Sequence, residues 1–191
     1  MIDKTLVFLK NNLNAYLTAG RKPNDPQEER VVFLDLKSTD SISFKLGAVS
    51  IILINVEQEN ILRAEDPYIQ FMADGTAQRV NPEIRLNLYL LFVARFQLYE
   101  DSLGNLSKII KYFQGHRLIN HQNSPELDEG IGQLIIELVS QTFSEQNEVW
   151  GTLRAPYHPS VLYKVKTLVY HDEDVVAPLA RIEEKIVGLA E

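Results

Sequence analysis

An alternating run of side chains from Ile84 to Phe92 constrains the fold more than any other feature of this sequence. Every second position of the run is apolar, and Arg85, Asn87 and Tyr89 stand between these positions. A period of two is typical of a β-strand with one buried face. Leu91 and Val93 interrupt the polar side, which predicts that the second half of this strand is covered on both faces.

Other segments predict a mixture of helices and strands. Apolar residues recur every three or four positions from Ile2 to Leu17 and from Leu98 to Gln114, which predicts two amphipathic helices, the second ended by Gly115. Ser144 is the predicted N-cap of a short third helix that includes Trp150. Strands are predicted at residues 31–35, 49–56, 134–139 and 161–170, with an edge strand at 42–46. Because the order lacks a regular strand–helix–strand rhythm, we predict an α+β domain with a mostly antiparallel sheet flanked by helices.

The last residues differ in character from the rest of the chain. Residues 171–191 contain six acidic and two basic side chains, and an apolar stripe repeats there at spacings of three, four and three: Leu179, Ile182, Ile186 and Leu189. We therefore predict a domain at 1–170, followed by an acidic linker and an amphipathic helical arm at 171–191. A helix this short is marginal in water. It needs a surface, either on its own domain or on a neighbouring subunit.

Composition excludes several classes of protein. The 191 residues include 19 basic and 26 acidic side chains, a net charge of −7, which argues against a nucleic-acid partner. Cysteine is absent, which excludes disulfides, thiolate zinc sites and iron–sulfur clusters. No run approaches the ~18 apolar residues of a membrane span, and the first residues lack the pattern of a signal peptide. These observations predict a cytoplasmic protein without a membrane-inserted segment.

Motifs that carry chemistry are weak or incomplete. Gly130 and Gly132 precede a predicted strand rather than follow one, so we expect them to form a turn and not a phosphate-binding loop. His116 and His121 are five residues apart, whereas helical metal ligands stand three or four apart. No serine lies in a nucleophile-elbow context. We therefore expect no catalytic residue, no metal site and no cofactor.

Several stretches in combination resemble a known family. The residues that carry the resemblance are Asn55–Glu59 with Leu62 and Arg63, Asn81–Phe92, Tyr99–Leu103, Ile109–Gln114, Val149–Trp150 and Ala155–Tyr157. Their order is similar to that of the cap, or tail-tube terminator, family of contractile injection systems. These are phage-tail-like particles that include virulence cassettes and antifeeding prophages. The resemblance extends from Met1 to about Asp174.

The resemblance implies a structural role. A protein of this family is expected to form a homo-hexameric ring on the end of the inner tube, to stop tube growth and to anchor the last layer of sheath protein. It would assemble in the cytoplasm, in a particle that is either released or anchored in the host. An assembly adaptor or chaperone for tube or cargo subunits remains an alternative, as does a small hydrolytic or binding enzyme.

A closed ring needs two different complementary patches on each subunit. The first predicted patch is the apolar stripe of the arm, at Leu179, Ile182, Ile186 and Leu189. The second is the edge strand, where Ile42, Phe44 and Leu46 alternate with polar residues and a partner strand would add by β-augmentation.

Overall fold

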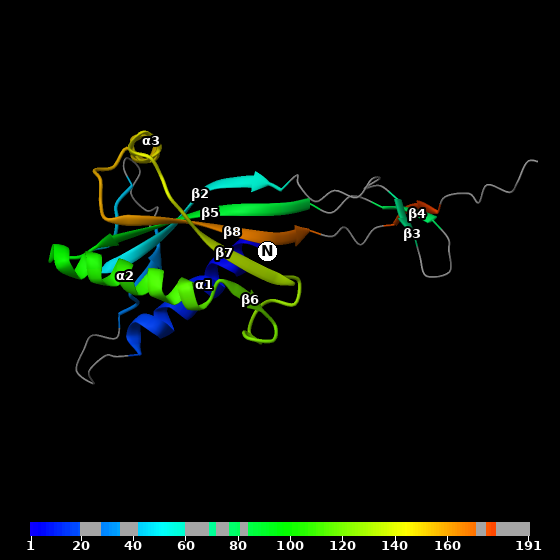
Figure 1. Ribbon diagram of the computed structural model, residues 1–191, viewed down its shortest axis with the longest axis horizontal. Helices are drawn as coiled ribbons and strands as arrows, with labels where there is room; N and C mark the ends of the chain where they lie inside the picture. The colour runs from blue at the N-terminus through cyan, green and yellow to red at the C-terminus, as the bar shows by residue number, and fades with distance from the viewer. Residues whose placement is uncertain are drawn as a thin grey trace, which may run out of the picture. The chain divides into compact units, whose positions relative to one another are not determined.

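The computed structural model describes residues 1–19, 28–34, 42–59, 69–71, 77–80, 84–170 and 175–178. The chain divides into two compact units (Figure 1). The first unit consists of Met1–Gln58 and Leu86–Leu168, and the second consists of Glu59–Arg85 and Val169–Glu191. Of the predicted linker and arm at 171–191, only 175–178 are described, and the apolar stripe of the arm lies outside the described residues. The division at residue 170 into a domain and an arm therefore stays a prediction.

The first unit is a six-stranded sheet with three helices. Its elements in chain order are α1 (Ile2–Thr18), β1 (Val31–Phe33), β2 (Ala48–Gln58), β5 (Ile84–Arg95), α2 (Tyr99–Gly115), β6 (Leu118–Asn120), β7 (Gln133–Val139), α3 (Phe143–Leu153) and β8 (Ser160–Tyr170). The strand order is β1-β2-β5-β8-β7-β6. The short β1 pairs with β2 in parallel, whereas the pairs β2–β5, β6–β7 and β7–β8 are antiparallel. The predicted α+β class with a mostly antiparallel sheet is confirmed.

The second unit contains a small antiparallel sheet of three strands. These are β3 (Ile69–Phe71), β4 (Ala77–Val80) and β9 (Val175–Pro178), in the order β3-β4-β9. None of the three is predicted from the sequence, and β9 falls within residues 171–191, for which an acidic linker and a helical arm are predicted. Pairing between β4 and β9 joins residues that are far apart in the chain, which a local pattern cannot reveal.

The large sheet has a hydrophobic core on each face. Helices α1 and α2 cover one face, and α3 lies against the other (Figure 1). On the first face, the Phe92 ring lies 5.6 Å from Phe113 and 5.8 Å from Tyr163 between ring centroids. On the second face, Leu91 and Val93 join a cluster with four other buried side chains: Phe44, Ile52, Trp150 and Leu162. Strand β5 therefore contributes to both cores, as the interrupted alternation predicts.

Two local predictions are wrong. Residues 42–46 do not form a strand; they lead to Gly47, whose φ of +82° is accessible to glycine and turns the chain into β2. Helix α3 is capped by Thr142, not by Ser144, because only Thr142 has a glutamate three residues later to complete a capping box.

Candidate assembly surface

A groove of about 490 Å³ lies between α3 and the sheet. Its lining is mostly apolar and comes from β2, β5, β7, α3 and β8. The apolar side chains that line it are Ile52, Leu53, Ile54, Tyr89, Val139, Val149, Leu153 and Leu162. Glu145 and Glu148 of α3 also line it, and both are exposed. The groove is therefore an apolar depression with negative charge along one side.

The capping box holds the acidic side of the groove in place. The Glu145 amide donates to Thr142 Oγ1 at 3.3 Å, and Glu145 Oε2 accepts from the Thr142 amide at 2.7 Å and from its hydroxyl at 2.9 Å. The hydrogen bond from the Thr142 amide has the larger effect and the one from its hydroxyl the smaller. Both lower the pKa of the Glu145 carboxyl and keep it ionised. At the other end of the helix, Trp150 is buried against Phe44, with ring centroids 5.9 Å apart. The helix is therefore fixed by a cap and by an aromatic anchor.

Paired charges cover another part of the large sheet. Glu57 Oε2 accepts hydrogen bonds from the Tyr89 hydroxyl at 2.7 Å and from Lys164 Nζ at 3.0 Å, and the Tyr89 bond is the main cause of the lowered pKa of Glu57. Lys166 and Glu137 form a second cross-strand pair at 2.6 Å. Partly exposed pairs of this kind contribute modestly to stability. In each pair the charge of the glutamate is neutralised by the lysine.

The exposed side of α2 is apolar in part. Leu98 at the N-cap and Tyr99 in the first turn are among the most exposed large apolar side chains. Leu103 is also exposed, and so is Ile110 two turns after it. Lys108 and Lys111 of the same helix are exposed. Neither lysine has an ion pair within the part of the chain that the structure describes. Glu100 and Asp101 in the first turn of the helix are exposed as well. This surface therefore combines apolar side chains with acidic residues where the helix begins and with lysines further along that are unpaired among the described residues.

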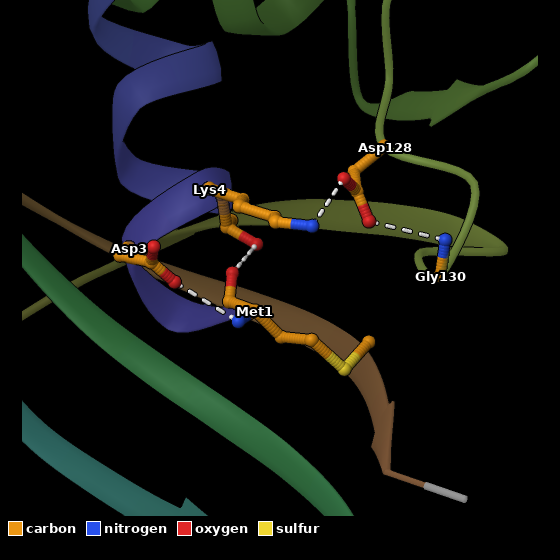
Figure 2. A network of polar contacts seen from close by, with 6 residues as sticks. Met1, Asp3, Lys4, Asp128 and Gly130 are labelled. Atoms are coloured by element: carbon orange, nitrogen blue, oxygen red, sulfur yellow. Dashed lines mark hydrogen bonds and ion pairs between the residues drawn. The ribbon is translucent and has the colours of Figure 1, made fainter.

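A polar network ties the beginning of α1 to the loop before β7. Lys4 Nζ lies 2.7 Å from Asp128 Oδ2, and the Gly130 amide donates to Asp128 Oδ1 at 3.1 Å (Figure 2). The bond from Lys4 is the main cause of the lowered pKa of the Asp128 carboxyl, and the bond from the Gly130 amide adds to it. Gly130 lies in the turn that leads into β7, as predicted. The role of this network is to hold that turn.

The predicted interface residues lie in three different surroundings. Phe44 is 3% exposed and belongs to the core, Ile42 packs at the margin of the same core, and Leu46 is 57% exposed. The four arm residues, Leu179, Ile182, Ile186 and Leu189, lie outside the described residues. The structure does not bring Ile42, Phe44 and Leu46 onto one exposed edge, and the interface role of the arm stays a prediction.

Sequence reasoning misses the exposed apolar residues. The helical period places Leu103 and Ile110 with the buried stripe of their helix, yet both are exposed. Phe143, at the first position of α3, is 93% exposed. The available signal is weak, because an apolar residue one position off a buried stripe looks the same in sequence as one within it.

The described histidines and acidic residues do not gather into a site. His116 Nδ1 lies 2.8 Å from the Tyr112 carbonyl oxygen, and its ring stacks on Tyr112 at 4.3 Å. Among the described residues, no three histidine, aspartate or glutamate side chains are placed to share a metal ion. No described helix has the length and apolar character needed to cross a membrane.

Comparisons with known proteins bear on the whole fold. Residues 5–182 match the model of the Pvc16 N-terminal domain. Among solved structures, the chain is similar to the sheath/tube terminator of PVC, an extracellular contractile injection system, in its extended state. The TM-score is 0.61 and the identity is 16%, over 100% of this chain and 64% of that one.

A second similar structure is the tube-terminating cap of the anti-feeding prophage. Here the TM-score is 0.53 and the identity 14%, over 94% of this chain and 61% of that one. The chain thus spans less than two thirds of the length of either protein. The comparison with curated proteins gives no match. At these identities the two structures show a shared fold.

Proposed function

This chain belongs to the Pvc16 N-terminal domain family, and we propose that it is part of a cap that terminates the tube and sheath of a contractile injection system. The observation that carries the proposal is the family match over residues 5–182. The fold shared with two terminator structures supports it, and the family resemblance seen in the sequence is confirmed.

In detail, the cap is a hexameric ring that sits on the last layer of the inner tube. It blocks the addition of further tube subunits and anchors the last sheath layer. Both activities require matched surfaces and no bond chemistry, so the role is structural rather than enzymatic. We further propose that assembly takes place in the cytoplasm, before any release or anchoring of the particle.

Tube length is the property that tests this function. Particles would be produced with the gene for this chain present, deleted, or deleted and restored from a plasmid, and measured by negative-stain electron microscopy. Without a terminator, tube addition has no stop, and we expect overlong, ragged or unsheathed tubes that return to uniform length on restoration. Unchanged lengths and intact ends in the deletion would reject the cap and favour an assembly adaptor or chaperone.

A further inference from the structure

We propose that successive copies of this chain contact one another head to tail, with the exposed side of α2 of one copy seated in the α3 groove of the next. The inference rests on the proposed function, because it assigns the contact that would close the ring. Identical subunits in a ring meet through two different patches, each complementary to the other. The described part of the first unit carries such a pair of patches.

The convex patch is a ridge on α2, made of Leu103, Ser107, Ile110 and Lys111. At 100° per residue these four positions fall within a sector of about 100° on the helix. All four side chains are exposed. Gly104 borders the ridge, and a β-carbon there would have nothing within 4 Å, so the ridge is open on that side as well. An apolar ridge flanked by small residues permits close approach of a partner.

The concave patch is the α3 groove, whose lining is mostly apolar and carries two glutamates on the side of α3. Glu145 and Glu148 are three residues apart on α3, as are Lys108 and Lys111 on α2. Each pair therefore spans a rise of about 4.5 Å along its helix. With Leu103 and Ile110 in the groove, Lys111 at the edge of the ridge can lie beside Glu148, whereas Lys108 lies further round the helix. Charge complementarity of this kind selects the partner and its register.

The two patches cannot meet within one copy. Helix α2 packs on the face of the sheet that carries Phe92 and Phe113, whereas α3 packs on the face that carries Leu91 (Figure 1). The sheet itself separates the ridge from the groove. Patches on opposite faces of a subunit give a heterologous contact, which propagates from copy to copy and closes into a ring when the rotation allows.

Cysteine cross-linking tests the contact directly, because the chain contains no cysteine. The full chain would carry Lys111→Cys together with Glu148→Cys and be assembled into particles. The particles would be treated with a short bismaleimide, and the products detected with an antibody to this chain. We expect a ladder of covalent multimers from the double variant and none from either single variant. Absence of the ladder in particles that contain the double variant would overturn the contact. Dimers formed by Lys111→Cys alone would do so as well, since they indicate a symmetric contact.

Charge reversal provides a second test that does not depend on a cross-linker. Lys111→Glu and Glu148→Lys should each lower incorporation into particles by at least about tenfold, equivalent to ~1.4 kcal/mol, and the combined variant should restore it. Failure of the combined variant to restore incorporation, when each single variant is folded by circular dichroism, would contradict the pairing.

An apolar substitution has a matched control in the same chain. Leu103 and Leu118 are similarly exposed, at 44% and 46%, but Leu118 lies on β6, outside both patches. Leu103→Asp should abolish the ladder of the double cysteine variant, and Leu118→Asp should leave it intact. An intact ladder with Leu103→Asp would remove the ridge from the contact.

The outcomes separate this contact from the function on which it rests. One outcome is that the deletion strain makes tubes of uncontrolled length but the double cysteine variant gives no ladder. It would leave the terminator role standing and reject the α2–groove contact. A ladder in particles whose tube length does not depend on the chain would support the contact and reject the terminator role.

Discussion

Replacing Phe44 with alanine should destabilise the core on the α3 side of the sheet. The Phe44 side chain is 3% exposed, and its ring meets Trp150 and His158 edge-on, at centroid distances of 5.9 and 5.5 Å. Its carbonyl oxygen accepts a hydrogen bond from Arg95 Nη1 at 2.7 Å, and the substitution leaves this bond in place. The ring contacts and the burial are therefore what the variant removes.

The expected cost follows from the burial of the ring. Loss of a buried phenylalanine side chain costs ~3–5 kcal/mol, from the lost transfer free energy and the cavity left behind. Phe44 lies in an irregular segment rather than in a strand, so its backbone can shift to fill part of the cavity. We therefore expect about 3 kcal/mol, at the lower end. With a urea m-value of about 2 kcal/mol per M, the unfolding midpoint should fall by about 1.5 M.

Trp150 is the only tryptophan of the chain and contacts Phe44 directly, so its fluorescence reports unfolding of this core. Far-UV circular dichroism of the same samples checks that the whole unit unfolds with it. Leu46→Ala is the matched control: Leu46 is 57% exposed on the same segment and should change stability by less than about 0.5 kcal/mol. A midpoint shift for Phe44→Ala no larger than that of Leu46→Ala would refute the assignment of Phe44 to the core.

Three further predictions concern the cap of α3, an acid response and the arm. Thr142→Ala should cost about 1 kcal/mol in urea unfolding, whereas Ser144→Ala should be nearly neutral, because only Thr142 caps the helix. Burial, then the nearby Arg95, lowers the pKa of His158 below 6.5. The unfolded state thus binds the proton more readily, and stability is lost as pH falls below about 6.5. His158→Gln should flatten this loss, measured by urea unfolding at about pH 7.5 and about pH 5.5. Ile182→Asp with Ile186→Asp should prevent incorporation into particles without unfolding the domain, and normal incorporation in a pull-down would exclude the arm from assembly.

The long elements were predictable because burial imposes a period on many consecutive residues. In α1, Leu9 and Leu13 are fully buried and lie on the predicted stripe. In β5, the change from simple alternation to a continuous apolar run marks the point where the second core begins. A pattern of this length averages over local exceptions, so the class of the fold followed from it.

Short elements and exposed positions were not predictable in the same way. Strand β4 has four residues, and its pairing of Arg79 with Ala177 depends on a partner about half the chain away. Alternation at Ile42, Phe44 and Leu46 is equally compatible with an edge strand and with a loop that inserts one ring into a core. On α2, only the packing shows that Leu106 is buried while Leu103 and Ile110 are exposed. The assembly surface therefore needed the three-dimensional structure.

The free edge of β2 bears on how copies of this chain associate. Strand β1 pairs only with Val49–Ile51, so among the described strands nothing pairs with that edge from Ile52 to Gln58. A register shift between Leu53 and Asn55 in the pairing with β5 marks an irregularity of β2 there, and Glu57 carries a charge tied to Lys164. Bulges and charges are the devices that keep sheet edges from pairing with other chains.

If this edge were the ring contact, the shift and the charge would oppose it. At the α2 ridge and the α3 groove, by contrast, Lys111 and Glu148 offer charges of opposite sign. Association through side-chain surfaces, rather than by addition of strands, is therefore the arrangement that these features favour. A Val56→Pro variant distinguishes the two, because proline in an edge strand removes an amide donor that a partner strand would use. Val56 is exposed and does not line the groove, so the substitution leaves the groove side chains in place. We expect this variant, if it folds by circular dichroism, to retain the cross-linked ladder when it is combined with Lys111→Cys and Glu148→Cys. Loss of the ladder in the folded variant would instead indicate pairing at the β2 edge.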